Sequence, residues 1–292
     1  MLGLLNLNKP KGATSRDAVN RVQWLARRVT GQRKIKVGHA GTLDPIATGV
    51  LVICLGSATR LIEYVQRMPK RYCGTFLLGH ISPSDDVEIE PVQLIDPPIP
   101  TIEQIESALP AFVGQIQQVP PTYSAIKIDG QKAYNLARAG KPPEMKPRPV
   151  TIYQIEIVRY EYPELVLDIR CGGGTYIRSL GRDLAKSLGT AAVMSELVRT
   201  AIGNFAVTDG VELSQLEESS LATSLLPAAS AVANLAQVEL TANEIEEIRH
   251  GRPIADRGLQ VPEVAMLSDD GELCAVGVEK RGGLWPTLVL KP

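Results

Sequence analysis

The segment GHAGTLDPIATGVL, residues 38–51, is the densest unusual stretch of the sequence. Its glycines at 38, 41 and 49 allow turns and close backbone approach, and they frame one histidine and one aspartate. Asp44-Pro45 fits two interpretations. It is either a helix N-cap followed by proline at the first helical position, or a loop that presents a carboxylate able to attack carbon.

The sequence before and just after this segment predicts a strand, a helix, a loop and a second strand. Residues 2–7 read as a strand, and Thr14 with Ser15 offers an N-cap for a helix to about Thr30. The expected apolar face of that helix comprises Val22, Leu25, Ala26 and Val29. Residues 31–45 form a basic, exposed loop, residues 50–55 a buried strand, and a further helix starts at Gly56 and Ser57.

The middle of the chain alternates between strand and helix signals. An acidic, proline-rich segment, residues 80–100, is expected to be a loop. Helices are predicted at 101–112, with a capping box of Thr101 and Gln104, at 131–139, and after the glycine-rich turn at 171–175 as far as Gly189. Strands are predicted at 71–78, 123–128 before an Asp129-Gly130 turn, 150–160, 164–170 and 193–201.

Composition changes after Asp209, where the chain becomes acidic and rich in alanine. The tail predicts a helix capped by Thr241 and Glu244, then strands around an Asp270-Gly271 turn. We therefore expect a domain at 1–209, a linker at 210–234 and a small, mostly β module at 235–292. The fold class is α/β, in the sense of α+β.

Bulk composition indicates an ordinary globular protein. Of 292 residues 44% are hydrophobic and 22% charged, and no apolar run reaches the ~18–20 residues of a membrane span. The N-terminal apolar stretch lacks the flanks of a signal peptide. The four cysteines are scattered, as expected of reduced thiols in a cytoplasmic protein.

The net charge of −1 conceals a strong asymmetry along the chain. Residues 1–72 carry 13 Lys and Arg against 3 Asp and Glu, a balance of +10. The balance is −7 over residues 73–110, +3 over 111–209 and −7 over 210–292. A basic N-terminal quarter is typical of proteins that bind a polyanion, although such a run can also be a solvated face.

Several common catalytic motifs are absent from the sequence. It contains no P-loop, no dinucleotide-binding glycine motif and no HExxH, and its three histidines suggest no zinc cluster and no serine triad. Two expectations remain at this point: carboxylate chemistry without a metal or other cofactor, or no chemistry.

Six motifs in series resemble the bacterial tRNA pseudouridine-55 synthases, the TruB family. They are NKPKGATS (8–15), GHAGTLDPIATGVL (38–51), KRY (70–72), SAIKIDGQKAYNLAR (124–138), TYIRSLGRDL (175–184) and LVRTAIGNF (197–205). The resemblance implies isomerisation of one uridine in the T loop of tRNA. It also implies a mixed, largely antiparallel sheet flanked by helices, and a C-terminal PUA-like RNA-binding module.

The same resemblance implies roles for single residues. Asp44 matches the nucleophile, Tyr72 the tyrosine that stacks on the target base, and Arg178 the arginine that pairs with the aspartate. The wall of the uridine pocket matches His39, Tyr176 and Leu197. The family usually shows Thr-Asp-Thr-x-Asp where this chain has Ser82-Pro83-Ser84-Asp85-Asp86, so the role of that loop is open.

Basic residues outside these positions are expected to contact RNA or to support the site. Lys9 and Lys127 could contact phosphate or brace the active-site loop. Arg33, Lys34 and Lys36 are expected to touch the RNA backbone. The expected partner is the T-arm stem-loop of tRNA. We expect the protein to be a monomer and not to associate with a membrane.

Two other function classes are weighed against this one. A non-catalytic tRNA-binding chaperone would have the same RNA site but no need of a nucleophile. A carboxylate glycosidase for small sugars would need a paired acid and no basic quarter. The sequence leaves open whether Asp44 attacks the sugar, attacks the base, or assists elimination through a glycal.

Overall fold

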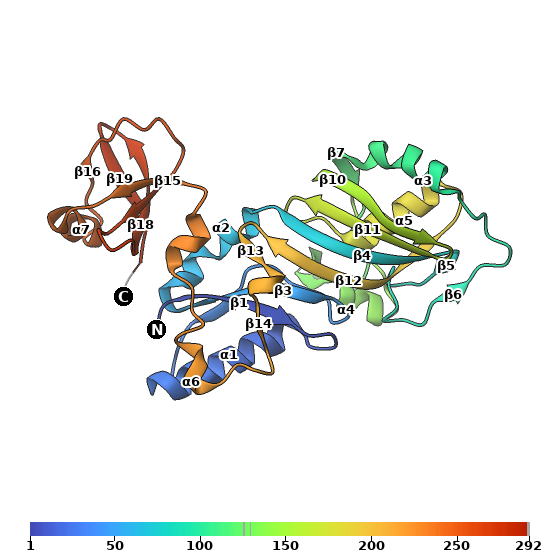
Figure 1. Ribbon diagram of the computed structural model, residues 1–292, viewed down its shortest axis with the longest axis horizontal. Coiled ribbons are helices and arrows are strands. Elements are labelled where there is room, and N and C mark those ends of the chain that lie inside the picture. Colours follow the sequence, from blue (N-terminus) through green and yellow to red (C-terminus); the bar gives the residue numbers. More distant parts are fainter. Residues whose placement is uncertain (125, 129, 291–292) are drawn as a thin grey trace. The chain divides into compact units, whose positions relative to one another are not determined.

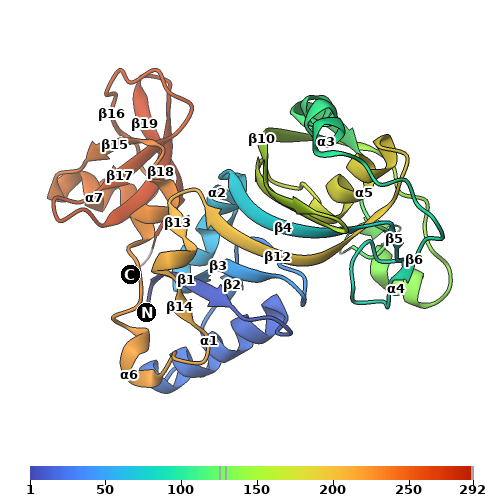
Figure 2. The same cartoon turned by 45° about the vertical axis from the view of Figure 1, so that its right-hand side comes forward.

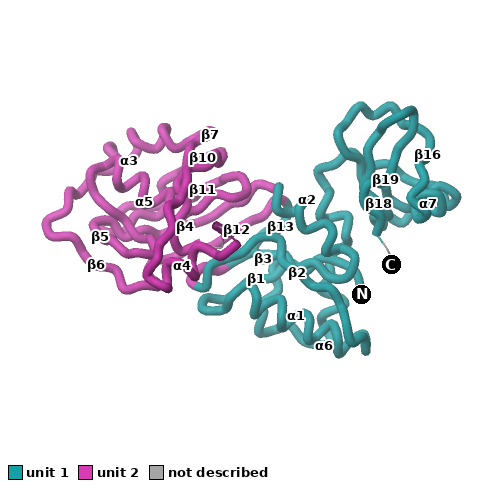
Figure 3. The backbone as a smooth tube through the Cα atoms, turned by 180° about the vertical axis from the view of Figure 1, so that it is seen from behind, with its two compact units in different colours: residues 1–45, 49–67, 204–292 teal, residues 46–48, 68–203 magenta. Residues whose placement is uncertain are grey.

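A computed structural model describes residues 1–124, 126–128 and 130–290. The chain divides into two compact units (Figure 3). Unit 1 comprises residues 1–45, 49–67 and 204–292, and unit 2 comprises residues 46–48 and 68–203.

Unit 1 contains both ends of the described chain. Its N-terminal elements are β1 (Gly3–Lys9), α1 (Ser15–Thr30), β2 (Val37–His39), β3 (Thr48–Leu55, whose first residue falls in unit 2), η1 (Gly56–Leu61) and α2 (Ile62–Arg67). Its later elements are β13 (Phe205–Ala206), η3 (Val207–Asp209), β14 (Val211–Glu212), α6 (Glu218–Leu221), η4 (Ala228–Val232), β15 (Ala236–Glu239), α7 (Ala242–Arg249), β16 (Ile254–Ala255), β17 (Val264–Leu267), β18 (Leu273–Lys280) and β19 (Gly283–Val289).

Strand β1 organises the first sheet segment of unit 1. It pairs antiparallel with β3 and parallel with β14, and β2 pairs with β3 (Figure 1). Helix α1 starts at the Thr14 N-cap, with a capping box to Asp17, and packs its apolar face on this sheet. Val22 and Leu25 are buried there as expected. Val29 is 39% exposed, so its assignment to that face was wrong: it lies in the last turn, at the rim of the packed stripe.

Residues 210–234, expected to be a linker, are packed against the rest of unit 1. Val211 and Glu212 extend the sheet beside β1, and Leu216 and Leu221 are fully buried in the core that α1 covers. Leu4 and Leu226 exchange backbone hydrogen bonds of 3.0 and 2.7 Å. The acidic, alanine-rich composition therefore belongs to a packed segment.

The C-terminal β module is present as a second sheet. Its order is β15-β17-β18-β19-β16, with β15 parallel to β17 and the other pairs antiparallel. Helix α7 carries the predicted capping box of Thr241 and Glu244 and packs Ile248 into the module's core.

Unit 2 contains the longest strands of the chain. Its elements are β4 (Lys70–Leu78), β5 (His80–Ile81), β6 (Val92–Gln93), α3 (Ile102–Ala108), η2 (Leu109–Phe112), β7 (Gly114–Gln118), β8 (Lys127–Ile128), β9 (Gln131–Lys132), α4 (Ala133–Arg138), β10 (Arg148–Glu161), β11 (Glu164–Cys171), α5 (Ile177–Ser187) and β12 (Ala192–Ile202).

Five of these strands form an antiparallel sheet in the order β12-β4-β11-β10-β7. Helix α5 lies along this sheet (Figure 2). The close approach depends on Gly181, since a Cβ there would lie 2.1 Å from the Phe76 ring of β4. The predicted α/β class, with largely antiparallel strands and a C-terminal β module, is confirmed.

Some boundaries in unit 2 differ from the sequence prediction. Strand β7 was not predicted, because GQIQQ has few strongly β-forming residues. Of the strand predicted at 123–128, the described residues form only β8, and Ala125 lies outside the described residues. The helix predicted at 131–139 begins after β9, at Ala133. Asp129 of the predicted turn lies outside the described residues.

Candidate active site

Asp44 lies in unit 1, on the connection between β2 and β3. Residues 40–47, all of which the structure describes, contain turns and no helix, so the N-cap interpretation of Asp44-Pro45 was wrong. Gly41 and Gly49, on either side, have φ of 119° and 98°, where a side chain would be strained. Asp44 is half-buried on this loop.

Buried polar groups hold the loop on both sides of Asp44. The Ser15 hydroxyl donates to the Leu43 carbonyl (3.1 Å) and accepts from the Leu43 amide (2.9 Å). The Lys9 ammonium donates to the carbonyls of Ala13 (2.7 Å), Pro10 (2.9 Å) and Pro45 (3.4 Å). Lys9 is fully buried, so of its two expected roles the structure supports bracing of the loop.

The expected basic contacts of unit 1 precede this loop. Arg33, Lys34 and Lys36 are exposed, while Ile35 between them is buried and its carbonyl accepts from the Gln23 side chain (2.9 Å). The charged side chains therefore project from an anchored segment. It leads into β2, where half-buried His39 pairs with Ile53 of β3.

Tyr72 and Leu197 come together in unit 2. Leu197 of β12 lies opposite Gly74 of β4, and Tyr72, two residues from Gly74, shares the same face. Both side chains are nearly buried. A Cβ on Gly74 would lie 3.5 Å from Ile177 of α5, so this face of the sheet meets the start of that helix.

Arg178 is buried on α5 and is held by the loop whose role the sequence left open. Its guanidinium donates to the carbonyls of Ser84 (2.8 Å) and Tyr123 (3.0 Å) and lies 3.4 Å from the Asp86 carboxylate. Asp86 is 1% exposed and accepts from the Ser84 hydroxyl at 2.5 Å. The loop thus supplies a buried carboxylate for Arg178, a function that Pro83 does not prevent.

Asp85, next to Asp86, binds a different arginine of the same helix. Its carboxylate lies 2.8 Å from Arg182. Burial raises the pKa of the Asp85 carboxyl, while Arg182 acts in the opposite direction. Two adjacent aspartates therefore hold two turns of α5. The only sequence signal for this arrangement was the acidic pair in an otherwise divergent loop.

The two remaining positions from unit 2 lie at its periphery. Tyr176 is half-buried at the N-cap of α5, with the Arg148 guanidinium 5.2 Å from its ring centre. Lys127 is exposed on β8, in a short hairpin with β9.

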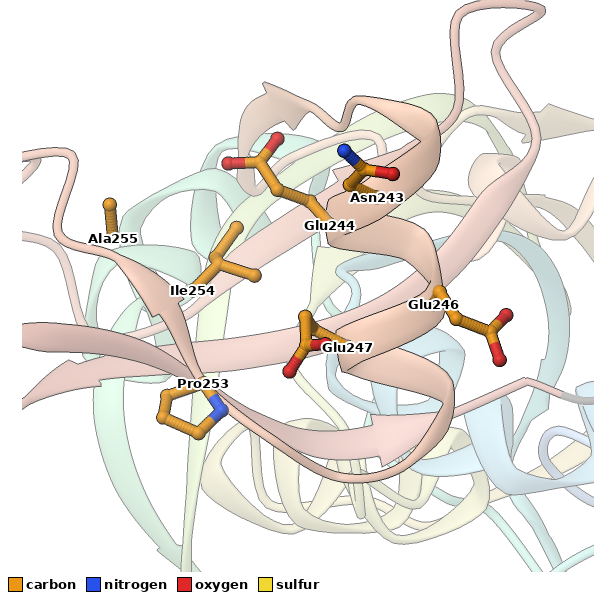
Figure 4. A pocket seen from close by; sticks show the side chains of 7 residues that line it. All are labelled: Asn243, Glu244, Glu246, Glu247, Pro253, Ile254 and Ala255. Carbon is orange, nitrogen blue, oxygen red and sulfur yellow. The ribbon is translucent and has the colours of Figure 1, made fainter.

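A cavity of about 470 Å³ lies in the C-terminal module, which is part of unit 1. Figure 4 shows Glu244 and Glu247 of α7 on the same side as Pro253 and Ile254, whereas the Glu246 side chain points away from them. Glu247 pairs with Arg252 and Glu244 with Arg257, so local arginines neutralise part of this charge. Because carboxylates still line its wall, this cavity is a poor site for phosphate.

Potential metal ligands and cysteine thiols are the remaining reactive groups. Within residues 1–124, 126–128 and 130–290, no group of three or more His, Cys, Asp or Glu is arranged to hold a metal ion. Burial raises the pKa of the Cys54 thiol to about 12 and of the Cys171 thiol to about 11, so neither is a ready nucleophile. No helix in the described part of the chain is long and apolar enough to cross a membrane.

Comparison with protein families gives two adjacent matches. A model described as "TruB family pseudouridylate synthase (N terminal domain)" matches residues 27–177. A second, "tRNA pseudouridylate synthase B C-terminal domain", matches residues 178–233.

Similar curated proteins are described as tRNA pseudouridine synthase B. The tRNA pseudouridine synthase B of Rhodopirellula baltica is 47% identical over 211 residues, 72% of this chain and 61% of that protein. That of Dehalococcoides mccartyi strain BAV1 is 41% identical over 290 residues, 98% of this chain and 95% of that protein. The chain belongs to the TruB family of pseudouridylate synthases.

Two solved structures contain chains with a fold similar to that of this protein. A chain of a Cbf5-Nop10-Gar1 complex has a TM-score of 0.72 at 26% identity, covering 99% of this chain and 84% of that one. A chain of an H/ACA RNP bound to a substrate RNA containing 2'-deoxyuridine has a TM-score of 0.72 at 24% identity, with coverage of 99% and 85%.

Proposed function

We propose that this protein isomerises uridine-55 in the T loop of tRNA to pseudouridine, with Asp44 as the nucleophile. The observation that carries the proposal is the hydrogen-bonded loop around Asp44. Lys9 and Ser15 fix the residues on both sides, and the carboxylate stays half-buried between them. Preorganised reactive groups of this kind suit catalysis, whereas a binding protein has no need of one.

The proposed reaction requires no redox step. The N1–C1′ glycosidic bond breaks, the base turns, a C5–C1′ bond forms, and the hydrogen on C5 leaves as a proton. A carboxylate can assist by adding to the sugar or the base, or by promoting elimination, as carboxylates do in glycosidases. All three routes need an aspartate at the position of Asp44.

The other candidate site residues have separate proposed roles. The base must leave the RNA stack, at a cost of a few kcal/mol, and Tyr72 receives its face. The proposed role of Arg178 is to pair with Asp44 and orient its carboxylate. His39, Tyr176 and Leu197 line the uridine pocket. The shared face of Tyr72 and Leu197 beside α5 supports this arrangement.

The proposed substrate element is the T-arm stem-loop, bound by a cytoplasmic monomer. Arg33, Lys34 and Lys36 are exposed and suited to the RNA backbone. The C-terminal module, residues 235–292, extends the footprint through shape-based contacts, since its own charge is acidic.

The test is incubation of the protein with an unmodified tRNA transcript, followed by chemical mapping of pseudouridine. We expect one new pseudouridine, at position 55, in full-length tRNA and in an isolated T-arm stem-loop. A product at another position would overturn the assignment of the site. Binding of tRNA with no product would favour the non-catalytic chaperone.

A further inference from the structure

Helix α5, which carries Arg178, starts without a cap of its own. The chain leaves β11 at Cys171 and passes through a glycine-rich turn in which Gly174 has φ 80°. Tyr176 then occupies the N-cap position, and its side chain makes no capping hydrogen bond. A helix start needs partners for its free amides, and a glycine-rich turn resists bending poorly. Another part of the chain must therefore fix this start.

The side chain of Gln118 supplies that fixation. Gln118 is the last residue of β7 and is 1% exposed. Its Oε1 accepts from the Tyr176 amide at 2.8 Å, and its Nε2 donates to the Tyr176 carbonyl at 3.0 Å. A primary amide can accept and donate in this way, whereas an ionised carboxylate can only accept.

Neighbours of Gln118 strengthen the contact. The carbonyl of Val119 accepts from the Ser179 hydroxyl (2.9 Å) and from Arg182 (2.9 Å), one and two turns further along α5. Arg148 lies opposite Gln118 in the β7–β10 ladder, and its guanidinium lies over the Tyr176 ring. The end of β7 thus sets the position of the first turns of α5, including Arg178 between Tyr176 and Ser179.

We propose that Gln118 is a positioning residue for base isomerisation. It fixes the backbone of Tyr176 and thereby the position of Arg178 at the start of α5. This inference rests on the proposed function. Gln118 needs no contact with the substrate in this role. Its effect should appear in the chemical step, because phosphate contacts elsewhere determine RNA affinity.

The test compares Gln118→Glu and Gln118→Met with the full-length wild type. The assay is tritium release from a T-arm stem-loop labelled at C5 of uridine, with circular dichroism and thermal unfolding to measure the folded fraction. Gln118→Glu keeps the acceptor and loses the donor, and Gln118→Met loses both. We expect kcat to fall about 10- to 100-fold per folded molecule, with KM within about threefold, as for loss of a buried hydrogen bond.

Gln117→Glu is the matched control, since Gln117 is exposed on the same strand and receives the same change of charge. It should keep the wild-type kcat. A wild-type kcat in folded Gln118 variants would overturn the proposal, as would a rise in KM alone or a loss proportional to unfolding. A variant that does not fold shows a purely structural role and also overturns it. If the wild type forms no pseudouridine, the proposed function itself fails.

Discussion

A buried charged side chain contacts each of two important parts of the candidate site, the Asp44 loop and Arg178. Lys9 places an ammonium among backbone carbonyls beneath the Asp44 loop, and Asp86 places a carboxylate against Arg178. Each would be costly to bury alone, and each is acceptable because hydrogen bonds replace the lost water. The Asp86–Arg178 pair is better explained by the position it gives Arg178 than by stability, since a buried ion pair often contributes little net free energy.

Asp86→Asn tests the pairing with Arg178. Removing one partner of a buried ion pair is destabilising, so the free energy of unfolding should fall by up to about 3–5 kcal/mol. The kcat should fall as well, through displacement of Arg178. Denaturant unfolding and tritium release measure the two effects. Glu90→Gln, an exposed change of the same kind, should leave both near wild type; an unchanged Asp86→Asn would show that the pair has no such role.

Lys70 predicts a pH dependence of stability. Burial lowers the pKa of Lys70 to about 8, from 10.5, with a further contribution from Arg199. Between these two values the unfolded chain binds more protons than the folded one, so stability should rise with pH across this window. The free energy of unfolding should rise by at most about 3 kcal/mol across this window. Below about pH 8 Lys70 is protonated in both states, so the cost of burying its charge no longer changes with pH.

The measurement is urea unfolding at several pH values between 7.5 and 10.5. Lys70→Met should remove this part of the rise, whereas Lys11→Met, at an exposed position, should retain it. The assignment would be contradicted if the free energy of unfolding rose with pH equally steeply in the wild type and in Lys70→Met.

At the scale of elements, local signals predicted those parts of the fold that local physics decides. The caps at Thr14, Thr101 and Thr241 each begin a helix where expected. Strand β7 escaped prediction because it pairs with residues of β10 that lie 30 to 38 positions later, and its own composition is weak. Residues 210–234 were expected to be a linker for a similar reason, since their partners lie in β1 and α1.

The candidate site shows the same limit. Motifs led to the prediction of Asp44, Tyr72 and Arg178 as site residues, because each falls in a distinctive short pattern. Asp86 and Gln118 could not be assigned roles in this way, because their partners, Arg178 and Tyr176, lie 92 and 58 residues later. Such contacts depend on tertiary packing, which spacing along the chain does not reveal.

The loop from 31 to 36 predicts a salt effect on binding. Replacing Arg33, Lys34 and Lys36 with glutamine should reduce the slope of log K against log salt by about two to three, if each residue displaces a counterion from the RNA. Titration of tRNA by filter binding at 50–300 mM salt measures the slope. Lys186→Gln, exposed at the end of α5, should have little effect. An unchanged slope in the triple variant would exclude this loop from the RNA backbone contact.

For the whole molecule, the distribution of charge matches the proposed division of work. The first 72 residues have a balance of +10 and include both the Asp44 loop and the exposed basic loop. The acidic C-terminal module adds a separate core with its own sheet. The catalytic chemistry is therefore expected from the first 209 residues, with the module contributing to affinity.

The central claim is that Asp44 performs the chemistry on a uridine of tRNA. The most direct measurement compares the wild type, Asp44→Asn and the exposed control Asp209→Asn for tRNA binding and for tritium release from C5-labelled uridine. We expect Asp44→Asn to bind tRNA within about threefold of the wild type while turnover falls by at least about a thousandfold, since a nucleophile has no substitute. Asp209→Asn should match the wild type in both. Turnover by Asp44→Asn within tenfold of the wild type would contradict the account.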